Sequence, residues 1–281
     1  MNKNITGLQR EPNGTIRLTV TIPNADIRKA WEEVIGGLVE KAEIKGFRKG
    51  KAPRKLVEER TNKENVKEEV LRKLLPIAYT DAIKTHGLRP IVNPKVHLEK
   101  IEDPKLNKDW QFTALTCEAP EVKLGNYKKN IQKITAKSKI AIPGKEQTPA
   151  KFEEIVKALI DSVIIEVPEL LVDNETDRLL SQTLEDVRKL GLTLDQYLSS
   201  IGKNPEVLRN EYKQKAGNDL KLELALVKIA EEEKITVEAS EIEEAIKAGK
   251  SDEEKKNLET NKYLLANILR QQKTLDFLKN L

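Results

Sequence analysis

Hydrophobic and polar residues alternate strictly over residues 15–22, where the sequence reads TIRLTVTI. A period of two residues is typical of a β-strand that buries one face. Residues 92–101 and 110–117 alternate in a similar way. We expect these three segments to pair as an antiparallel sheet near the start of the chain.

Two segments between the strands carry apolar residues at helical spacing. The first helix is predicted to begin at Asn24, a residue type that is favoured as an N-cap. Its apolar side is formed by Ile27, Trp31, Val34, Ile35 and Leu38. The second helix is predicted to end at Gly87 and to kink at Pro76. Its apolar side is formed by Val66, Val70, Leu74, Ile77 and Ile83.

These patterns predict an α+β domain over residues 1–118, with an antiparallel sheet and two or three helices. The third helix is short and follows Pro53, since proline suits the first turn of a helix. Beyond it, residues 120–134 have extended character, and residues 138–149 contain two prolines and a glycine. We therefore predict that residues 119–148 form an extended linker.

The remainder of the chain, residues 149–281, carries helical patterns throughout. Capping boxes are indicated by three pairs, Ser240 with Glu243, Ser251 with Glu254 and Thr193 with Gln196. Asn204-Pro205 indicates an N-cap residue followed by a proline in the first turn. Helix ends are indicated at Gly191 and Gly202. One narrow apolar stripe is formed by Leu180, Leu184, Val187 and Leu190. Narrow stripes predict an all-α, arm-like domain with an open bundle of helices.

Composition supports two slender domains more than one thick globule. Of 281 residues, 38% are hydrophobic, 34% are charged and only 4% are aromatic. The net charge of +4 is unevenly distributed, because residues 1–117 hold 23 Lys and Arg against 16 Asp and Glu, whereas residues 118–281 hold 27 against 30. The first domain is therefore expected to bind an acidic partner.

The sequence contains no recognisable motif for a disulfide, a zinc site or a catalytic centre. A single cysteine, Cys117, leaves no internal disulfide, and two histidines make a zinc cluster implausible. Phosphate-binding, dinucleotide-binding and nucleophile-elbow motifs are missing, so we expect no catalytic residue, no metal and no cofactor. The sequence shows neither a secretory signal nor a membrane-spanning run of apolar residues, which predicts a cytoplasmic protein without a membrane partner.

A basic loop is the most distinctive motif of the chain. Its sequence, GFRKGKAP, begins at Gly46 and ends at Pro53. The window from residue 41 to residue 55 holds seven basic residues against a single acid, Glu43. Gly46 and Gly50 allow backbone turns that other residues avoid, and Phe47 is placed at the tip. A solvated surface turn would also be basic, but the paired glycines and the lone phenyl ring favour a protruding docking site for phosphate-rich or acidic surfaces.

The loop and its surroundings resemble the ribosome-docking domain of the trigger factor family of bacterial chaperones. Gly46, Phe47, Arg48, Gly50 and Pro53 match the family's Gly-Phe-Arg-x-Gly-x-x-Pro loop. Residues 167–178, VPELLVDNETDR, and residues 191–198, GLTLDQYL, look like the family's C-terminal helical domain. The resemblance covers residues 1–134 and 150–281.

The resemblance implies an ATP-independent chaperone that binds the large ribosomal subunit at the tunnel exit, through protein and rRNA, and shields nascent or unfolded polypeptides. The residues implied in ribosome binding are Gly46, Phe47, Arg48, Lys49, Gly50, Lys51 and Pro53. No residue is assigned to client binding, and a homodimer away from the ribosome is left open. Many members insert an FKBP-type prolyl isomerase domain where this chain has about fifteen residues, so isomerase activity is not carried over.

Two other classes remain open at this point. A basic nucleic-acid-binding module would explain the charge of the first domain, although aromatic residues are not interleaved with basic ones as in stacking platforms. A periplasmic-type chaperone or foldase with a similar helical arm would explain the second domain. Tight binding to isolated RNA would favour the first of these alternatives.

Overall fold

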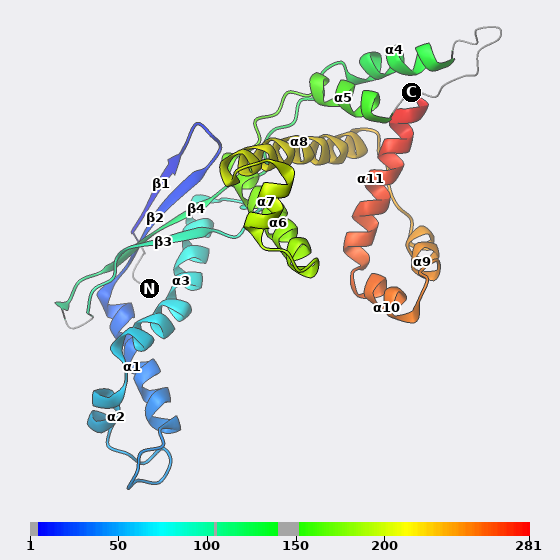
Figure 1. Cartoon of the computed structure of the whole chain (residues 1–281). Helices are drawn as coiled ribbons and strands as arrows, with labels where there is room; N and C mark the ends of the chain where they lie inside the picture. Colours follow the sequence, from blue (N-terminus) through cyan, green and yellow to red (C-terminus); the bar gives the residue numbers. More distant parts are fainter. Residues whose placement is uncertain (1–4, 104–105, 140–151) are drawn as a thin grey trace. The chain divides into compact units, whose positions relative to one another are not determined.

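The computed structural model describes residues 5–103, 106–139 and 152–281, and the chain divides into two compact units (Figure 1). The first unit comprises Met1–Ala119 together with Pro168–Leu170, and the second comprises Pro120–Val167 together with Leu171–Leu281. Each unit has a hydrophobic core of its own. The predicted combination of an antiparallel sheet with helices and a helical remainder is confirmed.

The sheet of the first unit has four strands in the order β1-β2-β4-β3, and all neighbouring strands are antiparallel. The strands are β1 (Ile5–Arg10), β2 (Ile16–Ile22), β3 (Lys95–Lys100) and β4 (Trp110–Thr116). In the register of the sheet, Leu18 of β2 lies between Leu8 of β1 and Ala114 of β4. Strand β1 was not expected, because ITGLQR contains a glycine and lacks alternation. Its extended conformation is stabilised by pairing with β2 and not by its local sequence pattern.

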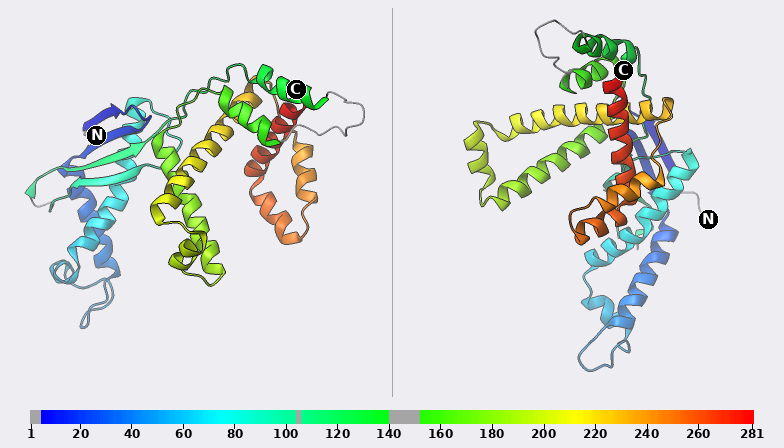
Figure 2. Two further views of the ribbon diagram at one scale, coloured as in Figure 1. Left: turned by 45° about the horizontal axis from the view of Figure 1, so that its top comes forward. Right: turned by 90° about the vertical axis from the view of Figure 1, so that its right-hand side faces the viewer.

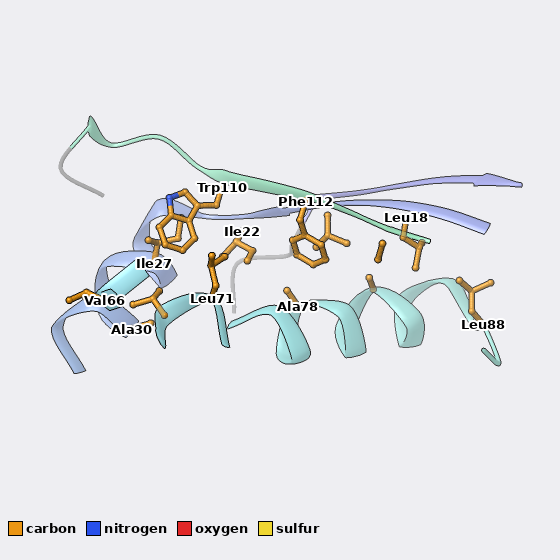
Figure 3. Close-up of a cluster of buried hydrophobic side chains, with 14 of the residues drawn as sticks. Leu18, Ile22, Ile27, Ala30, Val66, Leu71, Ala78, Leu88, Trp110 and Phe112 are labelled. Carbon is orange, nitrogen blue, oxygen red and sulfur yellow. The ribbon is translucent and has the colours of Figure 1, made fainter. Parts of the chain in front are cut away.

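The core of the first unit lies between one face of the sheet and the helices α1 (Asn24–Lys41) and α3 (Lys63–His86). Alternation along β2 places Leu18, Val20 and Ile22 on this face, where all three are buried. Trp110 and Phe112 of β4 are the largest fully buried side chains, and Figure 3 shows Phe112 directed at α3. Fully burying such side chains stabilises the fold by about 2 kcal/mol each.

Helix α3 ends at Gly87 as predicted, but the buried face of the helix differs from the predicted stripe. Ile77 is 56% exposed, whereas Ala78 and Ala82 are buried. Ala78 faces the sheet in Figure 3. We attribute the difference to close packing, because small side chains let the second half of the helix approach the sheet more closely than a stripe of isoleucines would.

The start of helix α1 also differs from the prediction. Asn24 does not cap the helix, since the N-cap residue is Pro23, and the first turn is capped from another segment by Asp109, whose carboxylate accepts a hydrogen bond of 2.8 Å from the backbone amide of Asn24. The side-chain amide of Asn24 instead donates a hydrogen bond of 3.1 Å to the carbonyl oxygen of Lys108. The asparagine therefore attaches the helix start to the connection between β3 and β4.

The core of the second unit is built by α4 (Tyr127–Lys139), α5 (Phe152–Ser162), α8 (Pro205–Glu232) and α11 (Lys262–Asn280). The expectation of an extended linker over residues 119–148 is wrong for α4, where Tyr127 and Ile131 are buried. These two residues lie about one helical turn apart, but the many lysines between and after them make the apolar stripe difficult to recognise in the sequence. Residues 140–148 of the predicted linker lie outside the described residues.

Helices α6 (Glu169–Lys189) and α7 (Leu194–Ile201) lead into α8 (Figure 2). The hydroxyl groups of Thr183 in α6 and Tyr212 in α8 form a hydrogen bond of 2.7 Å. The predicted caps of α7 and α8 are confirmed, because Thr193 and Gln196 form a capping box and the Asn204 side chain accepts a hydrogen bond from the backbone of α8. Leu190 is 75% exposed and lies just beyond the end of α6, so the predicted stripe ends at Val187.

Helices α9 (Ala239–Lys247) and α10 (Asp252–Thr260) precede α11. The Nζ atom of Lys273 in α11 lies 2.9 Å from both carboxylate oxygens of Glu241 in α9. The prediction that Ser240 caps α9 is wrong. Glu238 and Glu241 form the capping box, and Ser240 lies inside the helix. The Ser251 cap of α10 is confirmed. No helix in the described part of the chain is long and apolar enough to span a bilayer.

Candidate functional site

The basic loop connects α1 to α2 (Arg54–Arg60), and we call residues 42–53 the docking loop. Its base is closed by a hydrogen bond of 3.0 Å from the Gly50 amide to the carbonyl oxygen of Ala42. Inside it, the Phe47 amide donates to Ile44 at 3.0 Å and the Lys51 amide donates to Arg48 at 2.9 Å. These short-range bonds form consecutive turns, so the loop is a compact projection from the helix pair.

Both glycines of the motif have backbone conformations that explain their presence. Gly50 has a φ of 72°, and a Cβ atom there would lie 2.6 Å from the carbonyl oxygen of Glu40. Gly46 has a φ of 95° with open space around it. Gly46 is thus required only for its dihedral angle, whereas Gly50 is required for its angle and for the close approach of α1.

Phe47 lies between these glycines with 45% of its surface exposed. Ala52, five residues further along the loop, is buried. A phenyl ring that remains exposed adds little to the stability of the free chain, yet it provides a large apolar contact to a partner. The ring predicted to be at the tip is accessible.

The charges of the loop are only partly paired. The lone acid of the window, Glu43, lies 2.7 Å from the Nζ atom of Lys49, and both side chains are exposed. An exposed pair of this kind contributes at most about 1 kcal/mol, so Lys49 remains able to exchange its partner. Arg48 and Lys51 make no ion pair with any residue that the structure describes. The positive field of the loop is therefore largely uncompensated.

Arg54 fixes the loop exit to α1. Its guanidinium lies 2.6 Å from Glu32 of α1 and 2.5 Å from Glu58 of α2. The hydrogen bonds that the guanidinium donates to Glu58 and, second in effect, to Glu32 raise the pKa of Arg54 above its usual value. Pro53 precedes this residue as the N-cap of α2, one position earlier than the first-turn place that the sequence suggested. All seven predicted site residues lie in the docking loop.

Within the described residues, no group of His, Cys, Asp or Glu side chains is arranged to hold a metal ion. Cys117 is buried, and burial raises the pKa of its thiol. A protonated, buried thiol is a poor nucleophile. The surroundings of Cys117 therefore fit a structural role for this small residue.

A second candidate site, which the sequence did not indicate, is a groove of about 730 Å³ between α8 and α11. Its apolar lining includes Val227 of α8 and Tyr263, Leu264 and Ile268 of α11, all exposed, with Tyr263 at 83%. Carboxylates at the groove come from Asp219, Glu223 and Glu231. Only the three-dimensional pairing of two distant helices creates this surface, so no local sequence pattern indicated it.

Comparisons with known proteins place the chain in a family. Residues 3–155 match a family model described as "Bacterial trigger factor protein (TF)", and residues 128–280 match one described as "Bacterial trigger factor protein (TF) C-terminus". Each match covers more than half of the chain. The chain belongs to the trigger factor family.

Individual relatives agree with this assignment. Trigger factors of Staphylococcus aureus strains JH9 and Newman are 39% identical to the chain over 111 residues, which is 40% of this chain but only 25% of each relative. A solved trigger factor chaperone, described for promiscuous substrate recognition in folding and assembly, aligns with a TM-score of 0.65 over 98% of this chain and 99% of that chain. The sequence identity to it is 15%, so this likeness supports the fold.

Proposed function

We propose that this chain is an ATP-independent chaperone that docks on the ribosome near the tunnel exit and shields nascent polypeptides, thereby assisting folding and preventing aggregation. Membership of the trigger factor family supports the class. The single observation that carries the docking role is the exposed Phe47 ring on a basic loop held between two glycines with positive φ. This role places the protein in the cytoplasm.

Docking combines attraction at long range with an anchor at short range. Arg48, Lys49 and Lys51 steer the loop to rRNA phosphates and acidic protein surface of the large subunit. Phe47 then enters an apolar crevice and provides the central contact. Because phosphate contacts release counterions, affinity is expected to fall as salt rises.

The test is co-sedimentation with ribosomes at low and high salt. The triple variant Phe47→Ala, Arg48→Ala and Lys49→Ala is expected to abolish co-sedimentation. A matched control on α3, Ile77→Ala, Arg72→Ala and Lys84→Ala, also removes one exposed apolar side chain, one arginine and one lysine, and should bind normally. Unaltered binding by the loop variant would refute the site, and binding to isolated rRNA as tight as to ribosomes would favour a nucleic-acid-binding module.

For client binding we propose the groove between α8 and α11. Its exposed apolar side chains provide weak contacts that do not depend on a particular sequence, and no nucleotide is required. Replacing Tyr263 and Ile268 by serine should reduce suppression of aggregation several-fold in a light-scattering assay with an unfolded substrate. The control variant Lys256→Ser and Asn257→Ser on α10 should retain full suppression. Equal suppression by all three proteins would exclude the groove.

We further propose that the chain lacks prolyl isomerase activity. The two family matches overlap over residues 128–155, so no block of about a hundred residues separates them to form such a domain. A refolding reaction limited by proline isomerisation should proceed at the same rate with the protein and with buffer. A clear acceleration would contradict this proposal.

A further inference from the structure

A pocket of about 520 Å³ in the first unit is distinct from the docking loop. It lies between α1, α2, the start of α3 and the connection from β3 to β4. Trp31, Ile35 and Val66 provide its apolar lining. Ile35 and Val66 belong to the buried core, and the partly buried Trp31 packs against that core. The pocket therefore has a rigid apolar floor.

The charged groups around this pocket are unequally satisfied. Arg54 occupies the carboxylates of both Glu32 and Glu58, at 2.6 Å and 2.5 Å. Among the residues that the structure describes, Arg28 donates a side-chain hydrogen bond only to the amide oxygen of Asn107, at 3.4 Å. Lys63 lies 3.7 Å from the nearest oxygen of Asp103. The two acids facing Arg54 are thus well paired, whereas Arg28 and Lys63 have weak partners among the described residues.

Trp31 adds a third donor. In the part of the chain that the structure describes, its indole N–H makes no hydrogen bond. An indole at a partly exposed site usually finds an acceptor, from water or from a partner. A floor of apolar atoms with Arg28, Lys63 and an indole around it suits an apolar side chain that lies beside a carboxylate.

The pocket begins close to the docking loop. Ile35 precedes Ala42 by seven helical residues, which is about 10 Å at 1.5 Å per residue. Arg54 follows Pro53 directly and also lines the pocket. A specific interface usually involves about 20–30 residues on each side, which is more than the loop alone provides. A partner that covers the docking loop is therefore expected to extend over the pocket.

We propose that this pocket is a second docking point, which binds an apolar side chain next to an Asp or Glu on a ribosomal protein. The proposal rests on the docking function described above. A protein surface is favoured over rRNA because Glu32, Glu58 and Asp103 also line the pocket and repel a continuous chain of phosphates. A single carboxylate carries one negative charge, so the three acids repel it less than they repel a run of phosphates, and Arg28 and Lys63 attract it.

The first experiment is ribosome binding by the double variant Arg28→Glu and Lys63→Glu. Both residues are exposed, so the urea midpoint should stay unchanged while affinity for ribosomes falls about tenfold. The matched control Arg72→Glu and Lys84→Glu on α3 changes the net charge equally and should lose at most about twofold. Equal losses of ribosome affinity in the pocket variant and its control would contradict the proposed role of the pocket. So would unchanged affinity of the pocket variant while the loop triple variant fails to bind, and that result would still support the docking loop.

The second experiment identifies the partner. Thr61 lines the pocket, and Thr61→Cys can carry a benzophenone label, because the buried Cys117 leaves the new thiol as the reactive one. After irradiation with ribosomes, the label should attach to ribosomal protein, and attachment should decrease several-fold when Arg28→Glu and Lys63→Glu are added. Attachment to rRNA, or an amount independent of these two charges, would contradict the proposed partner. Binding retained by the loop triple variant would instead count against the docking loop.

Discussion

At Gly50 the backbone turns with a φ of 72°, and the space for a side chain is taken by the carbonyl oxygen of Glu40. We expect Gly50→Ala to destabilise the first unit by about 1–3 kcal/mol, because both the dihedral angle and the 2.6 Å contact must relax. The base of the docking loop would open, so ribosome binding should weaken as well. Urea unfolding and co-sedimentation measure the two effects.

Gly36→Ala is the control for this substitution. Gly36 lies inside helix α1 and is not among the glycines with positive φ, and a Cβ atom there would meet no atom from another part of the chain within 4 Å. Alanine should therefore stabilise the helix by about 0.5–1 kcal/mol. If both substitutions shift the urea midpoint in the same direction, the strain assigned to Gly50 is wrong.

Glu118 makes the stability of the first unit depend on pH. One carboxylate oxygen accepts a hydrogen bond of 2.7 Å from the Arg89 amide and the other lies 3.0 Å from Arg10, and these contacts lower the pKa of Glu118 from its usual 4.5. The contribution to stability is therefore present above pH 4.5 and is lost as the pH falls through the lowered pKa. Glu118→Gln should reduce the urea midpoint more at pH 7 than at pH 3. An equal reduction at both values would contradict this linkage.

At the level of elements, helix α4 is the clearest test of the core of the second unit. Ile131 is fully buried there, so Ile131→Ala should destabilise this unit by about 2–4 kcal/mol. Lys133→Ala, on the exposed side of the same helix, should change stability by less than about 0.5 kcal/mol. A small effect of Ile131→Ala, measured by urea unfolding, would restore the linker interpretation.

The elements also show what the sequence could predict. The presence of strand β2 and of helices α1 and α3 was predictable because apolar residues recur in each segment at the spacing of its element, although the buried face of α3 was not. Strand β1 and helix α4 were not, since β1 depends on its pairing with β2 and the stripe of α4 is diluted by lysines. Ser240 failed as a cap because a glutamate, a residue type outside the usual N-cap preferences, caps α9.

The same distinction applies to the candidate sites. Local sequence determines the turns of the docking loop and leaves Phe47 no buried neighbours along the chain, so its exposure could be predicted. The groove of α8 and α11, and the pocket around Trp31, could not be predicted. Each brings together residues that are far apart in sequence, such as Val227 with Tyr263 or Trp31 with Asp103.

At the scale of the whole molecule, the two cores share no described residue. Two separate unfolding transitions are therefore expected. Phe112→Ala should lower the free energy of unfolding of the first unit by about 3–5 kcal/mol. Ile229→Ala should lower the free energy of unfolding of the second unit by about 2–5 kcal/mol. Calorimetry of the two variants checks this expectation. A single transition that both substitutions shift equally would show that the units unfold together.

The core of the second unit contains Tyr127 and Ile131 from α4 as well as Leu278 from α11. During synthesis, α4 is therefore translated more than a hundred residues before α11, and the core cannot form completely until α11 has been synthesised. The first unit needs only its own segments and residues 168–170, so it can mature while translation of its own message continues. A nascent copy therefore completes the docking loop before the groove between α8 and α11 exists, and until α11 has been synthesised the apolar faces of α4 and α8 lack one of their packing partners.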